Sequence, residues 1–206
     1  MITIYQEFKK ELSRRKRGYA FIFGLILAGC FCGSLFMSIL DNHDKLLVIN
    51  KVKAYFDSIK DNNLNYLWAL KNNFLANFSY IILLWLLGLS IIGLPLILFF
   101  LFFKGFIIGF GITSIIYQYK IYGLFIALLY IFPHYIITVI ITMILGYYAV
   151  TFSINLLLAL LKSKTINFAE IMNRYLKILS MTLILTSIVI LYTVFVIPNI
   201  IRFFLP

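Results

Sequence analysis

Few side chains in this sequence could take part in chemistry, and they do not occur at catalytic spacings. The candidates are two histidines, His43 and His134, and two cysteines, Cys30 and Cys32. Neither histidine has a zinc-binding context such as H-E-x-x-H, and the cysteines are not a redox C-x-x-C pair. Residues 62–169 contain no acidic residue that could act in general acid–base catalysis. We therefore predict a protein that is not an enzyme and that uses neither a cofactor nor a metal.

One cation occurs where an apolar environment is expected. Lys104 lies within the stretch F-F-K-G-F-I-I-G-F-G-I of residues 102–112 and is followed by Gly105, Gly109 and Gly111. A charge at the centre of a bilayer costs at least about 2.5–3.5 kcal/mol, so such a residue marks a functional or paired position. Glycines four residues apart let two helices approach closely. Two uses of this stripe stay open: packing within one chain, with Lys104 donating to backbone carbonyls, or self-association into a homodimer.

The elements that must position these residues are membrane-spanning helices. The chain has 206 residues, of which 63% are hydrophobic and only 12% are charged, and its mean hydropathy is +1.02. Its apolar runs are about 20 residues long, enough to cross a bilayer core of about 30 Å. We predict an all-α, multi-pass membrane protein. The net charge of +11 comes from cations beside the apolar runs, which indicates contact with membrane lipid rather than with nucleic acid.

The N-terminal region predicts a surface helix and then a span. Residues 1–17 are basic, and apolar residues recur there every four positions, which is typical of an amphipathic helix on a membrane. The positive-inside rule places this segment in the cytoplasm. Residues 18–40 are the first predicted transmembrane helix, because this run is longer than the apolar part of a signal peptide. In it, Gly29 and Gly33 form another small-residue stripe, for which packing within the chain is preferred to dimerisation.

Residues 41–73 form the one sizeable polar segment, which we predict to be an extracytoplasmic loop. Helical periodicity indicates one amphipathic helix before Asn62 and a second, short helix after it. At 33 residues the segment is too small for an enzyme domain, but it can offer a docking face. The apolar residues on these two helical faces are the candidate partner-binding residues: Val52, Phe56, Ile59, Leu67 and Trp68.

The rest of the chain, residues 74–206, is predicted to be a bundle of transmembrane helices. Counting the run at 18–40, the sequence contains six apolar runs: 18–40, 74–93, 95–118, 121–141, 144–161 and 178–198. Between the last two lies a basic segment, in which residues 165–177 have the periodicity of an interfacial helix, with Asn167 and Glu170 at capping-box spacing.

Six crossings would place that basic segment outside the cell, against the positive-inside rule. We therefore prefer five crossings and one broken or re-entrant segment, with six full crossings as the alternative. The segment assigned to the break is 95–118, because Gly93 and Pro95 disturb its start and Lys104 lies at its middle. Pro133 and His134 are further polar or kink positions within the membrane.

Several of these residues resemble a known family. The stretch from Phe103 to Phe110, F-K-G-F-I-I-G-F, resembles the F-K-G-x-x-x-G-F stretch of the stage II sporulation protein M family. Pro133-His134 and the small residues at 149–153 are similar to the family's proline-containing span and the span after it. Wider relatives continue with P-H-G and then a glutamate, whereas Tyr135 follows here. Length, basic N-terminus and a single outer loop agree across nearly the whole chain.

The resemblance implies a function that composition does not. Members are non-enzymatic membrane scaffolds that anchor and localise peptidoglycan-remodelling enzymes at the sporulation septum, in the mother-cell membrane, so that the forespore can be engulfed. The implied partners are the peptidoglycan hydrolases of the engulfment complex. The residues leave an alternative open: a permease or transport-related subunit, in which Lys104 meets an anion and the helix at 165–177 contacts a cytoplasmic ATPase.

Overall fold

All regular structure in the described part of the chain is helical. The computed structural model describes the backbone of residues 2–61, 63–161 and 167–202, and the side chains of these residues except 2–15, 121 and 123–133. The element order is α1 (Ile2–Ile39), α2 (Asn42–Lys60), α3 (Tyr66–Gly88), α4 (Gly93–Leu160), α5 (Phe168–Leu191), the π-helix η1 (Tyr192–Val196) and α6 (Ile197–Arg202). The predicted all-α fold is confirmed.

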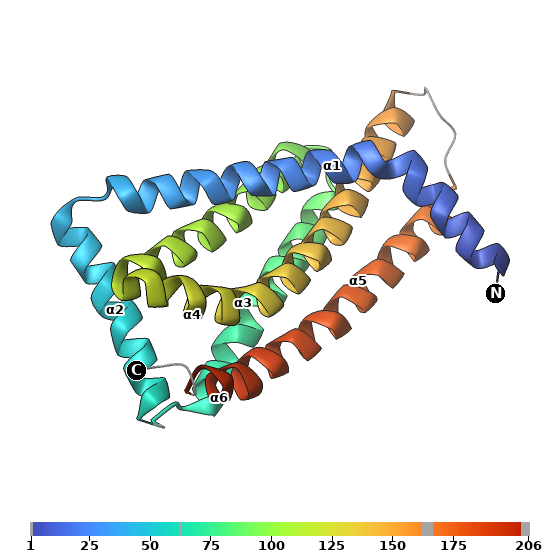
Figure 1. Ribbon diagram of the computed structural model, residues 1–206. Helices are drawn as coiled ribbons and strands as arrows, with labels where there is room; N and C mark the ends of the chain where they lie inside the picture. The colour runs from blue at the N-terminus through green and yellow to red at the C-terminus, as the bar shows by residue number, and fades with distance from the viewer. Residues whose placement is uncertain (1, 62, 162–166, 203–206) are drawn as a thin grey trace.

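Five helical stretches of the described residues are long and apolar enough to cross a membrane. They are Lys16–Ile39, Tyr66–Gly88, Gly93–Lys120, His134–Leu160 and Phe168–Arg202. In Figure 1 these stretches cross one another as a bundle, and α2 runs across one end of it. The arrangement is that of a multi-pass membrane protein with five spans.

Helix α4 corrects the predicted position of the break. Its 68 residues are helical except for one kink at Lys120, where φ is 52° and ψ is −125°. The run 95–118, which we expected to be broken or re-entrant, is an unbroken part of the first half of α4. The runs 121–141 and 144–161, expected to be two spans, belong to one helix after the kink. The count of five spans is as preferred, but the interruption follows 95–118 instead of lying within it.

The glycine and the proline that were expected to break this region do not interrupt a helix. Gly93 and Pro95 lie in the first turn of α4, where backbone N–H groups have no acceptor within the helix, so proline is tolerated. A β-carbon at Gly93 would overlap the carbonyl oxygen of Leu87, so glycine permits the tight connection from α3 to α4. The backbone is also helical from Pro133 to Gly146, which includes the gap expected between the runs 121–141 and 144–161.

Three short helices predicted from periodicity are continuous with spans. The basic segment 1–17 and the span 18–40 are one helix from Ile2 onwards. The helix expected around Leu67 and Trp68 is the first turn of α3, which Asn65 caps by accepting a hydrogen bond from the Trp68 N–H at 3.0 Å. The interfacial helix expected at 165–177 is, from Phe168 on, the first part of α5; residues 165 and 166 lie outside the described residues. Asn167 caps α5 at the Glu170 N–H, as its spacing predicts.

Different parts of the chain meet at the two ends of the bundle. At one end, which we name the loop end, the start of the first span reaches α4, where Tyr19 stacks on Tyr147 with ring centroids 4.3 Å apart. At this end the Ser153 hydroxyl of α4 donates to the carbonyl of Ser90, in the turn between α3 and α4. At the opposite end, which we name the α2 end, α2 packs on α4 and α6 (Figure 1).

A buried tyrosine near the beginning of α5 contacts α3 and α4 at the loop end. Tyr175 is only 2% exposed, and its hydroxyl donates to the carbonyl of Trp85 at 2.9 Å. Its ring stacks on Phe152, with centroids 4.8 Å apart. The basic beginning of α5 therefore lies at the same end as Lys16 and the start of the first span, which is the relative placement that five crossings predict.

Candidate functional site

The two glycine stripes face each other. A β-carbon added at any of four glycines would overlap a backbone carbonyl oxygen of the opposite helix. The pairs are Gly29 with Phe102, Gly33 with Phe106, Gly105 with Ile26 and Gly109 with Cys30. In addition, the Ser34 hydroxyl of α1 lies 3.3 Å from the carbonyl oxygen of Gly109 in α4. Both stripes are thus used in one contact between α1 and α4, and a homodimer of this fold would need another face.

Lys104 is held by side chains of the neighbouring helix. Its ammonium nitrogen lies 3.5 Å from the amide oxygen of Asn77 and 4.8 Å from the ring centroid of Tyr80, both in α3. The amide nitrogen of Asn77 in turn donates to the carbonyl of Asn73 at 2.9 Å. We expected Lys104 to donate to backbone carbonyls freed near Gly93, but its partners are a side-chain amide and an aromatic face. This cluster joins α3 to α4 and places the Lys104 ammonium between these two spans, about halfway along each.

His134 belongs to a second buried polar cluster, with a partner that sequence reasoning did not identify. Its Nδ1 lies 2.6 Å from the hydroxyl oxygen of Thr193, which also lies 2.7 Å from the carbonyl oxygen of Val189. If the single hydroxyl proton goes to that carbonyl, Nδ1 must carry a proton and donate to Thr193. Thr193 lies within η1, and π-helical turns of this kind are frequent at functional sites. Nothing in the spacing of His134 and Thr193 indicated this pairing.

The α2 end corrects part of the predicted partner-binding surface. Phe56 and Ile59 are 2% and 0% exposed, so they form a core instead of a docking face. They pack with Ile115 of α4 and with apolar residues of α6. The apolar stripe of α2 was read correctly as one face of a helix, but the chain's own helices cover it.

Two of the predicted partner-binding residues are exposed. Leu67 and Trp68, in the first turn of α3, are 82% and 66% exposed. Val52 is half-buried beside the Phe56 core. The exposed pair therefore remains available at the α2 end, and its role in partner binding stays a prediction.

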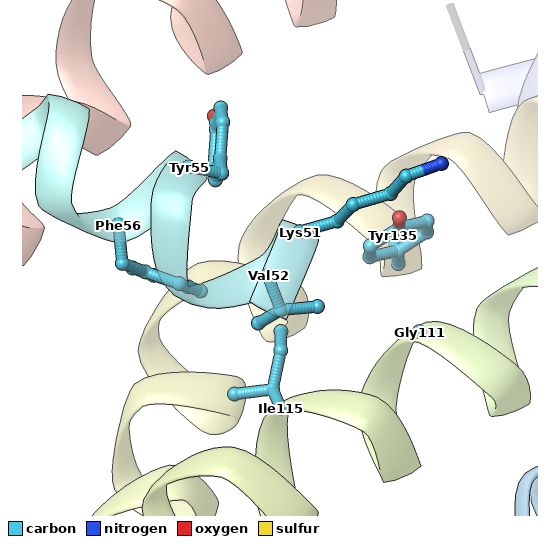
Figure 2. A pocket seen from close by; sticks show the side chains of 7 residues that line it. All are labelled: Lys51, Val52, Tyr55, Phe56, Gly111, Ile115 and Tyr135. Atoms are coloured by element: carbon cyan, nitrogen blue, oxygen red, sulfur yellow. The ribbon is translucent and has the colours of Figure 1, made fainter. Parts of the chain in front are cut away.

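A cavity of about 260 Å³ lies between α2 and α4 at this end (Figure 2). From α2 it is lined by Lys51, Val52, Tyr55 and Phe56. From α4 it is lined by Gly111 and Ile115, before the kink, and by Tyr135, after it. The sequence predicts Gly111 to be one of the packing glycines, but outside its own helical turn no atom lies within 4 Å of where its β-carbon would be.

Sequence reasoning did not find this cavity. Gly111 and Ile115 are four residues apart, so a common helical face was visible, as it was for Lys51 and Tyr55. That these two faces oppose each other depends on how α2 folds back over α4, which helical spacing does not encode. Among the described residues, no three His, Cys, Asp or Glu side chains come together as a metal site would require. The polar side-chain groups that line the cavity are the ammonium of Lys51 and the phenols of Tyr55 and Tyr135.

Comparison with protein families gives one match. A family model described as Stage II sporulation protein M matches residues 20–198. The matched range contains the contact between α1 and α4, the Lys104 and His134 clusters and the whole of α2. No curated protein and no solved structure matches the chain.

Proposed function

The chain belongs to the stage II sporulation protein M family, and on this basis we propose that it is a non-enzymatic scaffold of the sporulation septum. In this role it anchors peptidoglycan hydrolases and localises them where septal wall is remodelled during engulfment. The family match itself supports a membrane protein connected with sporulation, and the scaffold role is the further step that we propose.

We propose an orientation in the mother-cell membrane with the loop end in the cytoplasm and the α2 end outside. Lys16 and Arg17 flank the first span at the loop end, and Arg174 and Lys177 lie in the first turns of α5 at the same end. Basic flanks of this kind favour the cytoplasmic side. The α2 end then faces the compartment that holds the wall.

The observation that carries the scaffold proposal is the exposed first turn of α3. Trp68 and Leu67 are exposed at the α2 end, and tryptophan is enriched among the residues that dominate the binding energy of protein interfaces. The turn is fixed by the Asn65 cap and by Tyr66, whose ring stacks on Phe195 with centroids 5.9 Å apart. Two exposed apolar side chains are thus presented on a rigid base, which reduces the entropy lost on binding.

Affinity purification from sporulating cells tests the proposal. Replacement of Leu67 and Trp68 by Asp should abolish co-purification of peptidoglycan hydrolases, while membrane insertion and protein amount stay unchanged. The matched control is Asn72→Asp, which adds a negative charge about one turn further along α3 at an exposed polar position. Undiminished capture of the hydrolases by the Leu67→Asp/Trp68→Asp variant would contradict docking at this turn.

One feature favours a second candidate function, that of a permease or transport-related subunit. The positive charge of Lys104 lies in the middle of two spans, and ionisable residues at such depth often mark a solute pathway. Flux of a small anion into vesicles that contain the purified protein, lost in Lys104→Leu, would support this function. Hydrolase capture that persists in Lys104→Leu together with no flux in the unaltered protein would favour the scaffold.

A further inference from the structure

The cavity beneath α2 combines an apolar wall with a cation at its edge. Val52, Phe56 and Ile115 supply apolar surface, and Figure 2 shows the Lys51 side chain directed away from Phe56, towards the side on which Tyr135 lies. We propose that this cavity binds one anionic phospholipid, with part of an acyl chain against the apolar wall and the phosphate at Lys51 and Tyr135. The inference does not depend on the scaffold proposal.

The depth of the cavity suits a lipid at the border of the membrane. Gly111 and Ile115 precede the kink at Lys120 by nine and five residues (120 − 111 and 120 − 115). At a rise of 1.5 Å per residue they lie about 14 and 8 Å from the end of that span. Half of a bilayer core is about 15 Å thick, so the apolar wall is at acyl-chain level. Lys51 comes from α2, which runs across this end of the bundle (Figure 1).

The charges around Lys51 favour an anionic headgroup. Lys51 is exposed and makes no ion pair with an acidic side chain among the described residues. Asp57 is six residues further along α2, which places it on a different face of the helix. Lys45, six residues before Lys51, likewise lies on a different face, with its ammonium 5.1 Å from the ring centroid of Tyr117. Long side chains with a cationic tip commonly reach the phosphate level in this manner.

Gly111 is the residue that leaves room for the chain. No atom lies within 4 Å of the position of a β-carbon there, so a larger side chain can enter the cavity without displacing backbone. The four packing glycines of the contact between α1 and α4 lack this freedom, because each of them lies against a carbonyl oxygen. Gly111→Leu therefore tests the cavity without disturbing the bundle.

Native mass spectrometry of the full chain, purified with phosphatidylglycerol and phosphatidylcholine of identical acyl chains, measures the occupancy. We expect one phosphatidylglycerol per chain to be retained in preference to phosphatidylcholine. Lys51→Gln should lower this retention about fivefold, from the loss of one cation near the headgroup. Gly111→Leu should abolish it at an unchanged melting temperature. The matched control, Lys53→Gln, removes the same charge from an exposed position that does not line the cavity.

Several outcomes would overturn the inference. Equal losses in Lys51→Gln and Lys53→Gln would show attraction to the surface at large. Displacement of the lipid by glycerol 3-phosphate would show that a phosphate alone suffices and that the apolar wall contributes nothing. If Gly111→Leu leaves lipid retention intact but abolishes hydrolase capture, the cavity receives a partner protein's side chain instead.

Discussion

Gly33 of α1 lies directly against the carbonyl oxygen of Phe106 in α4, so that the two helices touch backbone to backbone. The same relationship holds at three further glycines on both helices, over two turns of each. Contacts of this kind stabilise membrane helices through close van der Waals packing, because no hydrophobic driving force acts between helices in lipid. The first span is thereby held to the centre of the bundle.

Larger residues in this contact should destabilise the fold. Gly33→Leu and Gly109→Leu must each push the two backbones apart, and overpacking of this kind costs about 1–3 kcal/mol. Thermal unfolding of the purified protein in detergent measures the loss. Gly24→Leu is the control, because Gly24 is exposed in α1 and nothing lies within 4 Å of its missing β-carbon. Unchanged melting with loss of a cross-linked dimer would assign the stripe to self-association instead.

Lys104 and Asn77 should behave as a coupled pair. Asn77→Leu removes the acceptor of a partly buried ammonium, and hydrogen bonds to charged groups contribute about 1.5–3 kcal/mol. The double variant Asn77→Leu/Lys104→Met removes the charge as well, so it should be more stable than Asn77→Leu alone. A double-mutant cycle of unfolding free energies checks this, with the exposed Asn72→Leu as control. Strictly additive losses would show that the two residues do not interact.

The kink at Lys120 should prefer glycine. Its φ of 52° with ψ of −125° is a conformation that β-carbons disfavour and that glycine adopts freely. Strain of this type costs about 1–3 kcal/mol, so Lys120→Gly should raise the free energy of unfolding and the β-branched Lys120→Val should lower it. Denaturation of both variants in the same detergent provides the comparison. A loss of stability in Lys120→Gly would mean that the lysine side chain contributes more than the strain that it imposes.

Chemical labelling should separate the two ends of the bundle. In a variant that lacks Cys30 and Cys32, a membrane-impermeant maleimide should label Lys53→Cys in intact protoplasts. Ile92→Cys, at a position that is 80% exposed at the loop end, should react only after permeabilisation. Labelling of both sites from the same side would contradict five spans, and the reverse pattern would invert the proposed orientation.

The helices themselves could be predicted because length and apolar periodicity follow from the residues locally. The glycine stripes at 29/33 and 105/109 were also visible, since their spacing alone indicates close packing. Their packing against each other could not be predicted, because a four-residue spacing does not indicate which helix lies opposite. The interruption expected within 95–118 was wrong, because Gly93 and Pro95, which usually interrupt helices, lie at the start of α4. The kink falls at the polar step Gln118-Tyr119-Lys120, which separates the predicted runs 95–118 and 121–141, although Lys120 carries no local preference for positive φ.

The candidate site was predicted less well because it depends on contacts between distant residues. Periodicity identified Phe56 and Ile59 as one face of a helix, but a helical face does not say what covers it. The cover comes from α4 and from α6, where the guanidinium of Arg202 donates to the carbonyl of Ile59 at 2.7 Å across 143 residues of sequence. Val52 and Gly111 were each singled out for other reasons, and the cavity that they share appears only in three dimensions.

That long-range bond from Arg202 to Ile59 has a consequence for biosynthesis. Helix α2 is translated early, but its packing is complete only when α6 has entered the membrane, because α6 supplies the guanidinium and, together with α4, the apolar residues beneath α2. A chain interrupted during synthesis would therefore insert its first helices yet leave α2 unsecured. Only finished molecules would therefore have a completed α2 end.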